Sequence, residues 1–97
     1  MKFLIVEDEK PNANRLKKMV EQLDNTYQVV DMVDSVSGAV EWFNQNTHPE
    51  IVLMDIRLAD GLSFDIFSRV KVGSAVIFTT AYDEYALQAF KVNGVDY

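Results

Sequence analysis

Oxygen-bearing side chains follow three short apolar runs of this 97-residue chain, each at the point where a run ends. They are Glu7, Asp8 and Glu9 after residues 3–6, Asp55 after residues 51–54, and Thr79 and Thr80 after residues 75–78. Carboxylates that crowd together repel one another, so a cluster of them favours a bound cation. The chain has no cysteine and one histidine, and a hard ion such as Mg²⁺ is therefore favoured over zinc.

Mg²⁺ sites in proteins commonly use one or two carboxylates together with water and phosphate oxygens. Asp8 and Asp55 would supply the carboxylates here, and the backbone carbonyl of Arg57 would supply a neutral oxygen. A carboxylate beside such an ion can attack phosphorus and form an aspartyl phosphate. The metal neutralises the transferring group, while Thr80 and backbone N–H groups can donate to its oxygens.

Each of these residues also has an ordinary interpretation. An acidic residue after a strand is more often a helix cap or a solvated turn residue, and a threonine at a strand end is usually a good strand former. The chemical interpretation therefore depends on the three strand ends being neighbours in the fold.

The elements that would position these residues alternate regularly along the chain. Strands are predicted at 3–6, 28–33, 51–54 and 75–78, with the entry to a fifth at 95–97. Helices are predicted from Pro11 to Asn25, from Ser35 to His48, from Leu62 to Gly73 and from Asp83 to Asn93. In the first helix, apolar residues at i, i+3, i+4 and i+7 form one face: Leu16, Met19, Val20 and Leu23.

This alternation predicts an α/β fold, a doubly wound parallel sheet with helices on both faces. Right-handed crossovers leave few arrangements, and we adopt the flavodoxin-like order 2-1-3-4-5. Ligands of such sheets bind at the carboxyl ends of the strands, so the acids and the threonine would converge there. We expect one domain over 1–97 that lacks the rest of its fifth strand and the following helix, which would leave the fourth strand as an exposed edge.

Charge and hydropathy exclude several classes of function. The formal net charge is −6, with 15 acidic against 9 basic residues, so direct contact with nucleic acid is not expected. Runs of 18 apolar residues and a signal-peptide core are both missing, so we expect a cytoplasmic protein without membrane contact.

Four sequence segments resemble the receiver domain of two-component response regulators. They are Phe-Leu-Ile-Val-Glu-Asp-Glu at 3–9, Ile-Val-Leu-Met-Asp-Ile-Arg-Leu at 51–58, Asp-Gly at 60–61 and Val-Ile-Phe-Thr-Thr-Ala-Tyr at 76–82. Residues 78–86, Ala89-Phe90 and Val95-Asp96-Tyr97 are most similar to regulators of the LytTR type. The resemblance extends over essentially the whole chain.

The resemblance implies a role for each matching residue. Asp55 is the phosphoacceptor, and Glu7 and Asp8 are the acidic pair for Mg²⁺, with Glu7 acting through water. Arg57 lends its carbonyl to the metal, Thr80 is the switch hydroxyl and Tyr97 is the switch aromatic. A sensor histidine kinase would donate the phosphoryl group, and the surface of the fourth helix and fifth strand would change. Homodimerisation and DNA binding by a separate effector domain would follow.

The chain departs from the family pattern at two places. The family's lysine follows the switch aromatic, and the sequence ends at Tyr97 before that position. Ala59 stands where many receivers have proline, which should only loosen that turn.

Three other functions remain as alternatives. A phosphohydrolase of the haloacid dehalogenase type also attacks with an aspartate. Such an enzyme usually has a second acidic residue two positions later as its general acid and base, and that position is Arg57 here. An interaction module that never accepts phosphate would not need Glu7, Asp8, Asp55 and Thr80 together. A flavin- or nucleotide-binding domain would need a glycine-rich loop where Glu7 to Glu9 stand. We expect a receiver that promotes only its own phosphorylation and dephosphorylation rather than an enzyme.

Overall fold

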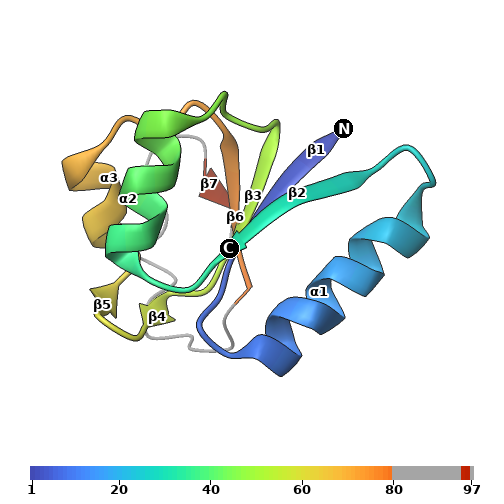
Figure 1. Ribbon diagram of the computed structural model, residues 1–97, viewed down its shortest axis with the longest axis horizontal. Helices are drawn as coiled ribbons and strands as arrows, with labels where there is room; N and C mark the ends of the chain where they lie inside the picture. The colour runs from blue at the N-terminus through green and yellow to red at the C-terminus, as the bar shows by residue number, and fades with distance from the viewer. Residues whose placement is uncertain (80–94, 97) are drawn as a thin grey trace.

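The computed structural model describes residues 1–79 and the strand at 95–96. Its main sheet has five strands in the order β2-β1-β3-β6-β7, and every neighbouring pair is parallel (Figure 1). The strands are β1 (Lys2–Val6), β2 (Gln28–Val33), β3 (Ile51–Met54), β6 (Ala75–Phe78) and β7 (Val95–Asp96). The predicted doubly wound order is confirmed, because β6 and β7 are the fourth and fifth strands of that pattern.

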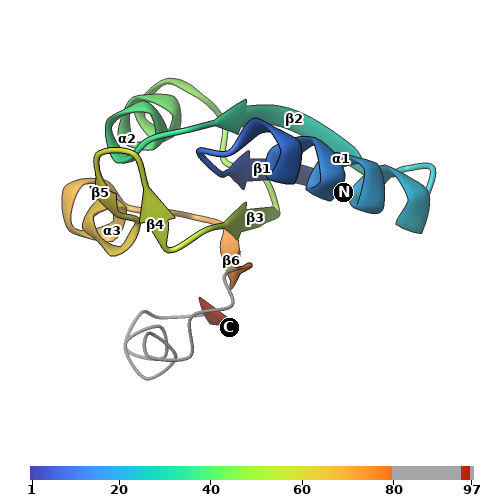
Figure 2. The same ribbon diagram turned by 90° about the horizontal axis from the view of Figure 1, so that it is seen from below.

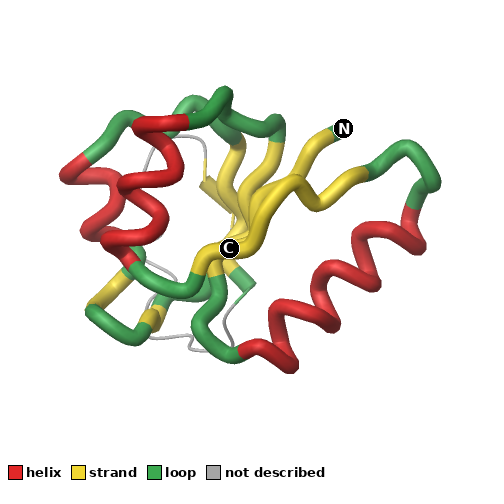
Figure 3. Tube along the Cα trace, viewed as in Figure 1, coloured by secondary structure: helices red, strands yellow, loops and turns green. Residues whose placement is uncertain are grey.

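Three helices occur in the part of the chain that the structure describes, namely α1 (Lys10–Leu23), α2 (Val36–Gln45) and α3 (Phe64–Arg69). Helix α1 lies on one face of the sheet, and α2 and α3 lie together on the other (Figures 2 and 3). Among the described residues, no helix is long and apolar enough to cross a membrane. The helix predicted after Asp83 falls outside the described residues.

The core lies mainly between the central strands and the pair α2 and α3. Leu4 and Val6 of β1 and Val52 and Met54 of β3 are all completely buried. Alternate residues of each strand point to one face of the sheet, so these four share the face that meets α2 and α3. Helices α2 and α3 contribute their own buried apolar residues, which are Val36, Ala39, Phe43 and Ile66.

Helix α1 buries less of its predicted apolar face than the spacing suggests. Val20 and Ala13 are buried, whereas Met19 is 53% exposed and Leu23 is 75% exposed. Helix α1 packs on β1 and on β2, which is the edge strand of the sheet. Only a narrow stripe of the helix therefore faces the sheet, and the spacing alone did not reveal this.

A short hairpin, which we did not predict, follows β3. Strands β4 (Arg57–Leu58) and β5 (Gly61–Leu62) are antiparallel, and Ala59 and Asp60 form the turn between them. Gly61 has φ of +147°, a conformation that side chains with a Cβ rarely adopt. Because Leu62 belongs to β5, α3 begins at Phe64 and not at Leu62 as predicted.

The outer side of β6 is also paired, contrary to our prediction of an exposed edge. Val76 and Ile77 of β6 are in register with Val95 and Asp96 of β7. The predicted entry to a fifth strand is thus confirmed at 95–96, and it covers β6.

Candidate metal and phosphoryl-transfer site

The strand register aligns the residues that follow β1, β3 and β6. Val6 is level with Met54, and Met54 is level with Phe78. The hydrogen-bond ladder then continues for one more residue: the Asp55 N–H donates to the carbonyl of Val6 at 2.9 Å, and the Thr79 N–H donates to that of Met54 at 2.9 Å. Glu7, Asp55 and Thr79 therefore leave the sheet at the same edge.

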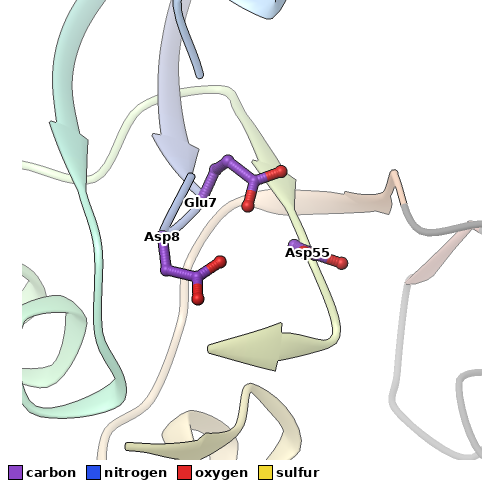
Figure 4. Close-up of side chains that lie close together, drawn as sticks. All are labelled: Glu7, Asp8 and Asp55. Atoms are coloured by element: carbon purple, nitrogen blue, oxygen red, sulfur yellow. The ribbon is translucent and has the colours of Figure 1, made fainter. Parts of the chain in front are cut away.

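Three carboxylates gather at this edge. One oxygen from each of Glu7, Asp8 and Asp55 lies within 4.8 Å of the other two. Figure 4 shows that Glu7 and Asp8 come from the end of β1, and that Asp55 comes from the end of β3. Glu7 is only 7% exposed, Asp55 is half-buried and Asp8 is open to solvent. Solvent therefore reaches the cluster from the side of Asp8, whereas the side of Glu7 is shielded from it.

The electrostatics of the cluster are most evident at Glu7. Burial raises the pKa of the Glu7 carboxyl to about 7, and the negative charge of Asp55 and hydrogen bonds with Asp8 and Asp55 contribute to this rise. One interaction opposes the shift, because the backbone N–H of Glu9 donates to Oε2 of Glu7 at 3.3 Å. A raised pKa of this kind indicates that the carboxylates favour an added positive charge, either a proton or a metal ion.

The carboxylate cluster fits a small hard cation. Oxygens bound to one Mg²⁺ at about 2.1 Å are roughly 3 Å apart when adjacent and roughly 4.2 Å apart when opposite. The observed limit of 4.8 Å is slightly larger, so a small closure or one intervening water suffices. Glu7 and Asp8 also line a cavity of about 420 Å³ with Lys10, Asn14 and Asp34, and since Asp55 does not line it, this cavity lies beside the carboxylate cluster rather than within it.

The other predicted site residues have more varied positions. Arg57 is exposed and begins β4, two residues after Asp55. Glu9 is the residue before α1, where its side chain makes no capping hydrogen bond. Thr79 is exposed, and Thr80 and Tyr97 lie outside the described residues.

Asp60 is a residue whose contacts we did not predict. The sequence marks Asp60-Gly61 only as a turn, but the structure places its carboxylate at the first backbone N–H groups of α2. Asparagine or aspartate before glycine is a general turn signal, and it gives no information about a distant helix that the side chain contacts.

Comparison with known proteins identifies the family. The model of the response regulator receiver domain matches residues 3–97. The chain is 38% identical over 100 residues to "Sensory transduction protein LytT" of Bacillus cereus, and 38% identical to "Positive alginate biosynthesis regulatory protein" of Pseudomonas aeruginosa. Each match spans all of this chain but only 40% of the length of the relative.

Two solved structures with the same fold are named as response regulators. A mutant of the MaeR response regulator bound to sulfate has a TM-score of 0.75 and 26% identity, over 99% of this chain and 81% of that one. A two-component response regulator of the LuxR family from Aurantimonas has a TM-score of 0.76 at 19% identity, over 93% of this chain and 66% of that one. The second likeness supports the fold alone.

Proposed function

Because the chain belongs to the response regulator receiver family, we propose that it stores a signal as a phosphoryl group on the carboxylate of Asp55. The observation that carries this proposal is the meeting of Glu7, Asp8 and Asp55 across two strand ends. A nucleophilic carboxylate next to a cation-binding acidic pair is the arrangement that phosphoryl transfer to aspartate requires.

Each described residue has a distinct part in the proposed reaction. Asp8 and Asp55, with the backbone carbonyl of Arg57, would hold Mg²⁺, and Glu7 would reach the ion through water. When bound, Mg²⁺ would neutralise the phosphoryl oxygens. An oxygen of Asp55 attacks phosphorus and the bond to the donor's leaving group breaks, so that Asp55 keeps the phosphoryl group. The hydrogen bond from the Asp55 N–H to Val6 holds the nucleophile's backbone in place.

The way in which phosphorylation of Asp55 would produce a response is proposed from the family and from the names of the relatives. A sensor histidine kinase in the cytoplasm would be the phosphoryl donor, and the hydroxyl of Thr80 would turn toward the new phosphoryl oxygens. Tyr97 would then occupy the space that Thr80 leaves, and the altered surface would favour a homodimer. A DNA-binding effector domain, as in transcriptional regulators of the LytR type, would convert dimerisation into control of transcription.

Intact mass spectrometry after incubation with acetyl phosphate tests the proposal. We expect the wild type to gain one phosphoryl group when Mg²⁺ is present and none when it is chelated. Asp55→Asn removes the nucleophile and should gain none. Glu21→Gln changes an exposed carboxylate near the carboxyl end of α1, away from the site, and should react as the wild type does. Equal labelling of wild type and Asp55→Asn would overturn the proposal.

A steady-state phosphatase assay separates this function from that of a phosphohydrolase. Receiver domains and regulators like LytT are not typical enzymes. Arg57 occupies the position of a phosphohydrolase's second acid, so an acid that would speed release from Asp55 is not at that position. We expect a single turnover per phosphorylated protein rather than sustained hydrolysis of a phosphate ester.

A further inference from the structure

The carboxylate of Asp60 binds the amino end of a helix to which it does not belong. The N–H of Val36 donates to Oδ1 of Asp60 at 2.7 Å, and the N–H of Ser37 donates to Oδ2 at 3.1 Å. The first N–H groups of a helix lack partners within the helix, so an outside carboxylate is a strong acceptor for them. Both oxygens of Asp60 are engaged in this contact.

Helix α2 also has a local cap at Ser35, so Asp60 is not the only residue that accepts hydrogen bonds from the amino end of this helix. Ser35 precedes α2, and its Oγ accepts the N–H of Gly38 at 2.9 Å. Ser35 is adjacent to the helix in sequence and links α2 only to itself. Asp60 instead joins α2 to the turn of the β4–β5 hairpin, and Figure 1 shows that hairpin beside the start of α2.

The hairpin is the segment that leads away from Asp55. At its base, the N–H of Ser63 donates to the carbonyl of Ile56 at 2.8 Å, and Ile56 is completely buried. At its tip, Ala59, Asp60 and Gly61 are exposed, so packing does little to hold them. The two hydrogen bonds of Asp60 therefore fix the end of the hairpin that packing leaves free.

We propose that Asp60 is a positioning residue for the phosphoryl-transfer site, because it ties the hairpin that carries Arg57 to the amino end of α2. The inference rests on the proposed function, in which the Arg57 carbonyl is a ligand of Mg²⁺. The buried side chains of Ile56 and Leu58 hold the backbone on either side of Arg57, and the contact at the tip acts together with them to set where that carbonyl lies. Outer contacts of this kind commonly have a large influence on metal affinity.

The test compares Asp60→Asn with Ser35→Ala in the otherwise unchanged chain. Both variants alter an acceptor at the amino end of α2, but only Asp60→Asn weakens the link to the hairpin. The dissociation constant for Mg²⁺ is measured by calorimetry well below the unfolding temperature of each variant. Hydrogen exchange of the Ser63 amide reports on the hairpin without any metal.

We expect Asp60→Asn to weaken Mg²⁺ binding by about tenfold, the lower end of the effect of losing an outer contact. The Ser63 amide should exchange faster in that variant. Ser35→Ala should keep the wild-type dissociation constant for Mg²⁺ and the wild-type exchange rate of the Ser63 amide. If the two variants bind Mg²⁺ equally well, Asp60 is only a helix cap and the inference is overturned. A wild type that neither binds Mg²⁺ nor gains a phosphoryl group would instead overturn the proposed function, and this inference with it.

Discussion

The negative charge of Asp55 helps to raise the pKa of Glu7, although the two residues follow different strands and are far apart in sequence. The parallel register of β1 and β3 brings the two carboxylates together, and burial of Glu7 strengthens their repulsion. In the proposed function, Mg²⁺ would therefore compete with a proton at Glu7.

Mg²⁺ affinity should therefore depend on pH. Since the pKa of Glu7 is about 7, a proton must leave the cluster when Mg²⁺ binds below that pH. We expect affinity to fall by up to about tenfold per pH unit below 7 and to level off above it. Calorimetric titrations from about pH 5.5 to about pH 8.5 measure this slope. Glu7→Gln should flatten it, and an equal slope in both proteins would rule out Glu7 as the source.

The stability of the metal-free protein should change with pH in the opposite direction. The pKa of Glu7 is raised from 4.5 to about 7 on folding, so the folded state binds the proton more tightly than the unfolded chain does. This stabilising effect is fully present below pH 4.5 and is lost as pH rises through about 7. In the presence of a chelator, we therefore expect the unfolding free energy of the wild type to fall relative to that of Glu7→Gln as pH rises from 4.5 to about 7. Saturating Mg²⁺ should restore stability above about pH 7.

Two leucines allow a matched test of the core. Leu4 of β1 is completely buried, and Leu23 of α1 is 75% exposed. Leu4→Ala should lower the free energy of unfolding by about 2–5 kcal/mol, because it removes packing and leaves a cavity. Leu23→Ala should change it by less than about 0.5 kcal/mol. Chemical denaturation measures both, and a large cost at Leu23 would contradict the exposure of that face of α1.

His48 should have a single tautomer. The N–H of Gly73 donates to Nδ1 at 2.9 Å, so Nδ1 is the acceptor and Nε2 carries the hydrogen that reaches the carbonyl of Phe43 at 2.8 Å. Nitrogen NMR of the ring should show the Nε2–H form. His48→Ala should lower the free energy of unfolding by about 1–3 kcal/mol, since both backbone groups lose their partner. A dominant Nδ1–H form would contradict this arrangement.

The pattern of the sequence was sufficient to predict most elements and their order. The limits of β3 and β6 matched the apolar runs 51–54 and 75–78, and Ser35 caps α2 as predicted. These features follow from local periodicity and local hydrogen bonding, which neighbouring residues determine. The acidic residues after β1 and β3 were visible for the same reason.

Tertiary structure decided the features that depend on residues far apart in sequence. The burial of Glu7, the spacing of its carboxylate from Asp8 and Asp55, and the contact of Asp60 with α2 all arise from the register of strands and the packing of loops. The exposure of Met19 and Leu23 likewise depends on α1 lying over the edge of the sheet. Periodicity shows which face of an element is apolar, but the neighbours that the fold supplies determine whether that face is covered and how charges interact.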